Sequence, residues 1–336
     1  MSTERALEPK IPDTKRMTRG LVYVVIASVV LYGAFALSAD AGNVLEALRR
    51  FPPWILGAAM SLSFANYLVR FVRWRMYCAR LSIELEPKTS FLIHLSGLAL
   101  TVSPGKMGEA FKSLLVRRIT GVPVAVSAPI VLAERFTDLL AFLVLIAIGA
   151  SASESGQSWI VWSTSALCAS LFAFVVSTRL QRVFVRTLAS SKAGSRFVPK
   201  IEEALASSRT LLAPSGLILP TLIATAGWSL ECFAFQLVAG AFVDGGVPFL
   251  FAAYTFALAA VAGAVAFIFP GGLGVTEASM GGLLRRRYVA SGLGVEAAAA
   301  SAVSATILIR LATLWFAVLV GVVAVLLFKR RHGGLT

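Results

Sequence analysis

Long apolar stretches are the feature that most restricts how this chain can fold. They cover residues 21–37, 54–77, 124–150, 159–177, 214–242 and 295–328. Stretches of this length cross a bilayer as helices, because backbone groups in lipid have to form their hydrogen bonds within the segment. With 57% hydrophobic and 14% charged residues, the chain has too little polar surface for a soluble domain. We therefore predict an all-α polytopic membrane protein.

Two further apolar stretches are interrupted by a Pro-Gly pair. The first, residues 90–103, is 14 residues long and ends at the pair 104–105. As a helix it would span about 21 Å, less than the roughly 30 Å of a hydrocarbon core. Proline cannot continue the helix and glycine permits a turn, so we expect the chain to reverse there. The second stretch, 248–269, ends at the pair 270–271. The sequence thus predicts two re-entrant helical hairpins.

The two interrupted stretches belong to an internal repeat. Each break is followed by a glycine and a glutamate, then by a basic cluster, and then by a long apolar helix that carries one arginine. The matching positions are Glu109 and Glu277, Arg117-Arg118 and Arg285-Arg286-Arg287, and Arg135 and Arg310. We expect repeat one at about 90–150 and repeat two at about 248–328, with inverted topology. This layout is typical of transporters that bind their substrate near the bilayer midplane.

Basic residues orient the predicted spans. Residues 178–213 hold seven basic and two acidic residues, which predicts a cytoplasmic loop. The tails 1–20 and 329–336 are expected on the same side, whereas 151–158 and 243–247 face outward. One transmembrane domain, 21–328, would then contain about six full spans and the two hairpins.

Two parts of this topology depend on interpretation. The arginines at the end of span 54–77 are interpreted as cytoplasmic, namely Arg70, Arg73, Arg75 and Arg80. Stretch 248–269 has 22 residues and is long enough to span alone, which would move the C-terminus outside. The re-entrant alternative places 285–287 on the outer face, against the charge rule. It is preferred because it keeps the C-terminal basic residues inside and makes the repeats equivalent.

Three motifs together resemble one family. They are Ser-Pro-Gly-Lys-Met-Gly-Glu at 103–109, Ala-Glu-Arg-Phe-Thr-Asp at 133–138 and Phe-Pro-Gly-Gly-Leu-Gly-Val-Thr-Glu at 269–277. In this order they resemble the lysylphosphatidylglycerol synthase transmembrane (flippase-like) family, which includes the flippase half of multiple peptide resistance factor proteins. The resemblance covers nearly the whole chain. It implies a multi-pass protein of the cytoplasmic membrane that moves a lipid between leaflets.

Several functions remain open at this point. No soluble stretch is long enough for the synthase domain, so the lipid could be an aminoacyl lipid, a glycolipid, or a polyprenyl-linked or hopanoid-related one. One alternative is an integral-membrane lipid- or glycan-transfer enzyme that uses Glu109, Glu134 and Asp138 as acid or base groups. Another is a non-transporting partner of a lipid-modifying enzyme, docked through 178–213. The sequence contains no P-loop, HExxH or nucleophile elbow, so we expect neither an enzyme nor a cofactor or metal.

Charged residues within apolar segments are the candidate site. Intramembrane charges are costly and face a partner or a wet cavity. Glu134 and Asp138 share a helix face, and Arg135 can reach Asp138 at i, i+3. These charges form either a structural ion pair or a headgroup or proton site. Glu109 and Glu277 either cap their helices or, with nearby lysines, contact a headgroup. Arg310 has no acid at i+3, so a phosphate, Glu277 or Glu231 would serve as its partner.

We expect the partners to be membrane lipids, anionic or phosphate-bearing. Nucleic acid is disfavoured because the basic residues lie next to apolar spans. The basic clusters either bind headgroups or extend to the interface. The predicted substrate-binding residues are Pro104, Gly105, Lys106, Gly108, Glu109, Lys112, Arg117, Arg118, Glu134, Arg135, Asp138, Glu231, Pro270, Gly271, Gly274, Glu277, Arg285, Arg286 and Arg310.

Overall fold

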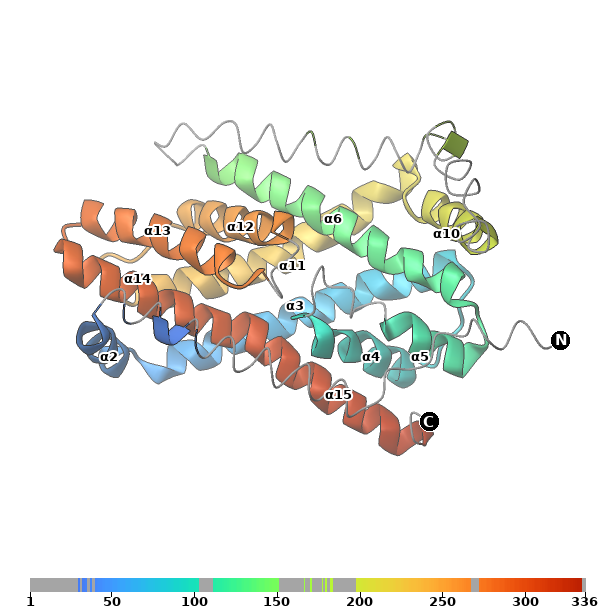
Figure 1. Cartoon of the computed structure of the whole chain (residues 1–336), viewed down its shortest axis with the longest axis horizontal. Helices are drawn as coiled ribbons and strands as arrows, with labels where there is room; N and C mark the ends of the chain where they lie inside the picture. Colours follow the sequence, from blue (N-terminus) through green and yellow to red (C-terminus); the bar gives the residue numbers. More distant parts are fainter. Residues whose placement is uncertain are drawn as a thin grey trace.

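The described part of the chain is helical and contains no strand (Figure 1). The computed structural model describes residues 40–102, 111–150, 198–266 and 272–333, with single positions between 30 and 37 and between 166 and 183. Predicted spans 21–37 and 159–177 therefore lie largely outside the described residues. The all-α fold class predicted from the apolar stretches is confirmed.

Long helices form the body of the molecule. They are α3 (Pro53–Arg80), α6 (Val124–Ala150), α11 (Pro214–Gly240) and a continuous helix made of α14 (Val295–Arg310), η5 (Leu311–Trp315) and α15 (Phe316–His332). Among the described residues, Pro53–Arg80, Gly216–Gly240 and Val295–His332 are long and apolar enough to cross a membrane. Helix α6 has the length, but it carries the charged residues that the sequence predicted.

Proline sets where several of these helices begin. Pro53, Pro87 and Pro214 each occupy the first turn of a helix, where the missing N–H has no helical partner to lose. These starts agree with the predicted spans to within a few residues.

Two pairs of shorter helices form hairpins. The first hairpin contains α4 (Pro87–Ser96), the 3-10 turn η2 (Gly97–Leu100) and α5 (Phe111–Thr120). The second contains α12 (Phe249–Val265) and α13 (Val275–Ala290). The connecting breaks at 103–110 and 267–271 lie outside the described residues. Helix α12 has 17 residues, fewer than the roughly 20 of a full span. Whether either hairpin is re-entrant in a bilayer stays a prediction.

The hairpins approach the middle of the molecule from opposite ends (Figure 1). Val102, at the end of the first hairpin's described outgoing arm, and Leu273, at the start of the second hairpin's return, belong to one apolar cluster. Leu314 and Val318 of the long helix complete it. The described ends of the two hairpins, at Val102 and Leu273, therefore contact one central region of the long C-terminal helix.

Small residues close the second hairpin. A Cβ atom added at Gly263 of α12 would lie 2.1 Å from Thr276 Oγ1 of α13. Gly272 has φ of 69°, a left-handed conformation that favours glycine, and lies against Gly263. The glycines around the second break are thus needed for both the turn and the close approach of its arms.

Two helices were not predicted. Helix α2 (Ala41–Arg50) begins at Asp40, whose carboxylate accepts a hydrogen bond of 2.9 Å from the Gly42 amide, and it packs on α14 through Val44. Helix α10 (Val198–Leu211) lies within the predicted loop 178–213 and packs against α6. The sidedness of that segment stays a prediction.

Candidate functional site

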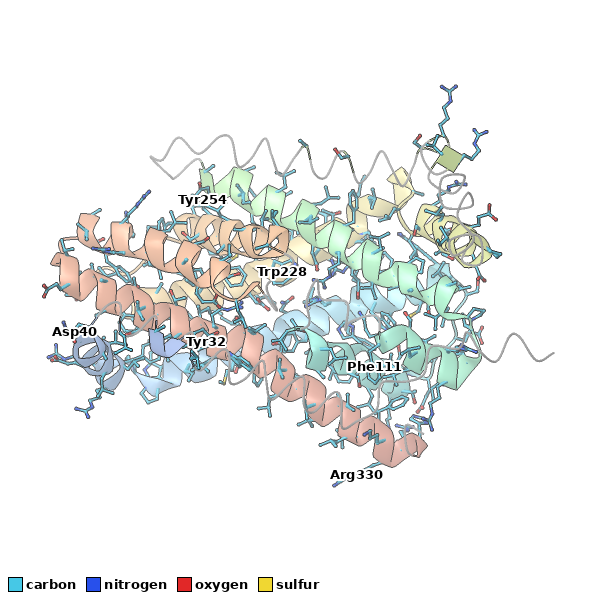
Figure 2. The ribbon with its side chains drawn as sticks, viewed as in Figure 1. Tyr32, Asp40, Phe111, Trp228, Tyr254 and Arg330 are labelled. Carbon is cyan, nitrogen blue, oxygen red and sulfur yellow. The ribbon has the colours of Figure 1, made fainter. Side chains whose placement is uncertain are left out.

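A buried group of charged and polar side chains lies between α3, α5, α6 and α11. We call it the central charged cluster. Its members are Asn66, Arg70, Arg73, Lys112, Glu134, Arg135, Asp138, Trp228 and Glu231. Trp228 marks its place near the middle of the molecule (Figure 2). A charged side chain buried inside a membrane protein needs neighbouring groups of opposite charge or hydrogen-bond partners.

Asp138 is the acceptor at the centre of this cluster. Its Oδ1 accepts hydrogen bonds from Arg73 Nη2 at 2.7 Å and from Trp228 Nε1 at 2.9 Å. Arg135 Nη2 lies 3.2 Å from Oδ2 as an ion pair. Arg73 also donates to the hydroxyl of Thr137 at 3.0 Å, so one side chain of α3 contacts two consecutive residues of α6. Two hydrogen-bond donors, from α3 and α11, and one ion-pairing guanidinium of α6 thus converge on one carboxylate.

Glu134 holds the returning arm of the first hairpin. Its carboxylate forms an ion pair with Lys112 of α5, and both side chains are at most 3% exposed. The Lys112 ammonium also lies 4.7 Å from the centre of the Trp74 ring, a cation–π distance. The lysine stem passes directly over Gly97, where an added Cβ would be 2.8 Å from Cδ. The pair therefore joins α5 to α6 and fits a space that only glycine leaves open.

The α11 side of the cluster contains a carboxylate and an aromatic ring. Glu231 accepts a hydrogen bond of 2.6 Å from the amide of Asn66. The Arg70 guanidinium lies over the Trp228 ring, 5.6 Å from its centre, and acts electrostatically on Glu134 and Asp138. Arg70 is 7% exposed and therefore lies within the protein.

A second charged site lies where the second hairpin meets the long helix. Arg310 Nε donates to Glu277 Oε1 at 2.6 Å, and Glu277 Oε2 accepts the Gly274 amide at 2.7 Å. Tyr32 OH lies 3.5 Å from Glu277 and accepts a hydrogen bond of 3.3 Å from Trp315 Nε1. Glu277 thus caps α13 and also pairs with a buried arginine, so its capping and ion-pairing interpretations hold together.

Comparison with known proteins identifies the family. The family described as lysylphosphatidylglycerol synthase TM region matches residues 21–321. The chain belongs to this family. A relative from Methanothermobacter thermautotrophicus, named UPF0104 membrane protein, is 26% identical over 337 residues, which cover 91% of this chain and 95% of the relative. The family, predicted from three motifs, is thus confirmed, and with it a multi-pass membrane protein.

The breaks that carry two of the three family motifs lie partly outside the described residues. These undescribed positions are Pro104, Gly105, Lys106, Gly108, Glu109, Pro270 and Gly271. Of the predicted set, the structure brings Lys112, Glu134, Arg135, Asp138 and Glu231 into the central charged cluster. Gly274, Glu277 and Arg310 form the second site.

The basic clusters lie away from both sites. Arg117 and Arg118 are half-buried near the end of α5, and Arg285 and Arg286 are exposed on α13. Their role at an interface with headgroups stays a prediction. Glu231 was considered as a partner for Arg310, but it bonds to Asn66, and Glu277 is the partner that the structure shows.

The cytoplasmic side predicted for Arg70 and Arg73 stays a prediction, but both side chains lie inside the helix bundle and not at its surface. Arg73 has no exposed surface and Arg70 only 7%. They precede the end of α3, at Arg80, by two to three helical turns, so they lie well inside the helix. The acids of α6 compensate their charge. The charge rule counts arginines near a span's end and does not distinguish those that face the bundle interior.

Sequence reasoning also missed Asn66 and Trp228 as members of the site. A signal existed on α3, because Asn66, Arg70, Arg73 and Tyr77 follow one another at i+4, i+3 and i+4 and so share one face. A polar stripe on an apolar span indicates a face turned toward protein or water. Trp228 gave no such signal, since a buried tryptophan is common in any core. Within the described ranges, no group of three metal-ligating side chains occurs.

Proposed function

We propose that this protein moves a lipid between the leaflets of the cytoplasmic membrane, with both termini on the cytoplasmic side. The observation that carries the proposal is the central charged cluster, which sets charged groups from four helices at mid-molecule in an otherwise apolar bundle. A headgroup crossing the hydrocarbon core needs polar groups to replace its water. Family membership supports a role in lipid handling.

The charge of the cluster supports an anionic or phosphate-bearing headgroup. Among its described members, four cations face three carboxylates, so the described part of the cluster carries one positive charge in excess. Guanidinium groups bind phosphate through two parallel hydrogen bonds, and Arg70 and Arg135 both supply such groups. The Arg135 side chain is 23% exposed, the largest exposure among the ion-paired residues of the cluster. In this proposal the headgroup's phosphate binds next to the Arg135 side chain of α6.

The opposed hairpins support alternating access. Each hairpin is joined to a long helix by an acid–base pair, Lys112 with Glu134 in the first and Glu277 with Arg310 in the second. In this proposal the pairs open in turn as the headgroup passes. The chain's energy source would be a lipid or ion gradient, since its sequence carries no nucleotide-binding motif.

Lipid exchange in reconstituted vesicles tests the proposal. Glu277→Gln keeps an acceptor for the Gly274 amide but removes the charge that Arg310 pairs with. We expect folded protein that loses exchange of a labelled anionic phospholipid, and the same result for Glu109→Gln. The matched control is Glu296→Gln, because Glu296 also lies in the first turn of a helix but is exposed. It should keep the wild-type rate.

The same vesicles distinguish the alternatives. Chemical change of the labelled lipid would favour the transfer enzyme. Absence of both exchange and chemical change, in protein that retains its fold, would favour a non-transporting partner of a lipid-modifying enzyme. Wild-type exchange by Glu109→Gln and Glu277→Gln would show that the breaks are architectural and that the site is misplaced.

A further inference from the structure

The long C-terminal helix contains a π-helical turn, η5, at its middle. Leu311–Trp315 includes neither proline nor glycine, so no helix-breaking residue accounts for it. Such turns inside α-helices are uncommon and often lie at functional positions. The widened turn leaves a carbonyl group that accepts a hydrogen bond from outside the helix: Tyr67 of α3 donates its hydroxyl to the Thr313 oxygen at 3.1 Å. Tyr67 is 1% exposed.

The helix changes its packing partners at this turn. Before it, α14 packs mainly against α13, α2 and α11. After it, α15 packs mainly against α4 and η2 of the first hairpin. Figure 1 shows α4, α5 and α15 gathered on one side of the molecule. The two halves of one helix therefore belong to two different groups of helices.

The first hairpin and α15 fit each other closely. A Cβ added at Gly321 would lie 2.0 Å from the Ala99 backbone nitrogen, so α15 touches the backbone of η2. At the far end, Arg331 donates to both carboxylate oxygens of Glu86, at 2.7 and 2.9 Å. Thr89 and His332 approach to 3.3 Å. Contacts at both ends of α15 indicate that these elements move together.

We infer that the π-helical turn is a hinge, and that the first hairpin and α15 rotate on it as one unit against α3, α6, α11, α12, α13 and α14. The use of this motion in transport rests on the proposed function. Tyr67 is the positioning residue that holds the hinge. The unit's other connections suit a rotation, because the α5–α6 connection passes through Gly121, whose φ is 75°.

The contacts across the boundary suggest how a headgroup would act on the hinge. Lys112, on the rotating unit, pairs with Glu134 on α6. An anionic headgroup competes for the Lys112 ammonium and so releases the unit. At the hairpin ends the contact is apolar, through Val102, Leu273 and Leu314. On α3 the Trp74 N–H donates to the Ser90 hydroxyl of α4 at 3.1 Å, so the rotation also has to break this hydrogen bond. Tyr67 lies next to Asn66, which bonds to Glu231, so the cluster and the hinge share one stretch of α3.

Distances between spin labels test the hinge without requiring transport. In a chain whose three cysteines are replaced, labels at Ile218 of α11 and Arg330 of α15 report on the two units, and both side chains are exposed. A rotation of about 20° over the 17 residues of α15 shifts its end by about 9 Å. Controls are Lys88 with Arg330, within the rotating unit, and Leu132 with Ile218, within the other unit.

We expect two distances for the 218/330 pair and one for each control. Vesicles containing phosphatidylglycerol should populate the second distance more than vesicles of phosphatidylcholine alone. Lys112→Met should populate it in both lipids, and Tyr67→Phe should broaden the 218/330 distribution without changing the controls.

A single 218/330 distance in both lipids and in Lys112→Met would overturn the hinge, and so would two distances in either control. These distance measurements test the hinge independently of the proposed lipid transport. Shifting distances without lipid exchange would leave the hinge and reject translocation, whereas exchange with one fixed distance would reject the hinge alone.

Discussion

Neutralising Asp138 should destabilise the protein strongly. Asp138→Asn keeps an oxygen that can accept the Trp228 N–H, but it removes the negative charge that faces Arg73 and Arg135. Arg73 is completely buried, so water cannot compensate for the loss. Removing one partner of a buried pair costs about 3–5 kcal/mol. We expect the free energy of unfolding to fall by that amount.

An exposed ion pair provides the control for the expected loss in the Asp138 variant. Glu46 and Arg50 on α2 form an i,i+4 pair whose side chains are 59% and 79% exposed. Glu46→Gln should reduce the free energy of unfolding by only about 0.3–0.5 kcal/mol. Reversible unfolding in dodecyl maltoside with increasing dodecyl sulfate, followed by circular dichroism, measures both variants.

A double variant separates lost pairing from lost packing. Arg73→Met with Asp138→Asn removes both charges while keeping both side chains close to their original volumes, so it should be more stable than Asp138→Asn alone. The reasoning fails if Asp138→Asn unfolds like Glu46→Gln, or if the double variant is less stable than the single one.

Two further predictions concern α15. Gly321→Ala should lower the free energy of unfolding by about 1–3 kcal/mol, because the new methyl group meets the η2 backbone. The control Gly282→Ala has nothing within 4 Å of the added methyl group and should be neutral or stabilising by up to about 1 kcal/mol. Thermal unfolding compares the two variants. The hydroxyl of Thr89 and the charge of Arg331 hold the pKa of Glu86 below its ordinary value. Its contact with Arg331 should therefore be present at neutral pH and lost as pH falls through that lowered pKa. A spin label at residue 330 should then become more mobile, and in Glu86→Gln it should be mobile at every pH.

Much of the fold was predictable because lipid restricts backbone structure so strongly. An apolar stretch of 20 or more residues has few alternatives to a helix, and the starts and ends of α3, α6 and α11 followed from composition and proline. The amphipathic helix α2 was missed because ten residues with four charged or polar side chains look like a loop in a hydropathy profile. Its apolar face became visible only against α14.

Part of the site was predictable from the sequence, but most of its pairings were not. Glu134, Arg135 and Asp138 stood out because charges in an apolar span are rare. The pair of Arg135 with Asp138 lies within α6 and followed from the spacing. The other partners come from other helices, and no spacing along the chain indicates that Asp138 meets Arg73, 65 residues away. Arg310 shows the opposite case, since its lack of a local acid pointed to a distant one, and Glu277 proved to be that partner.

The two hairpin pairs differ in a way that the sequence repeat concealed. In the first repeat the cation, Lys112, lies on the hairpin and the acid, Glu134, on the long helix. In the second repeat the acid, Glu277, lies on the hairpin and the cation, Arg310, on the long helix. Under the proposed function, an anionic headgroup would compete for the cation in each pair. It would therefore bind to the hairpin itself in the first repeat but to the long helix in the second.

Under the proposed function, this exchange of roles would separate the two halves of a transport cycle. Binding at Lys112 would attach the headgroup to the unit that we propose rotates on the π-helical turn, so the lipid would move with it. Binding at Arg310 would attach the headgroup to α14, directly before the turn, and leave Glu277 with the Gly274 amide and the Tyr32 hydroxyl as partners. Two repeats with the same motif would then act in sequence rather than in parallel, since one carries the headgroup and the other receives it.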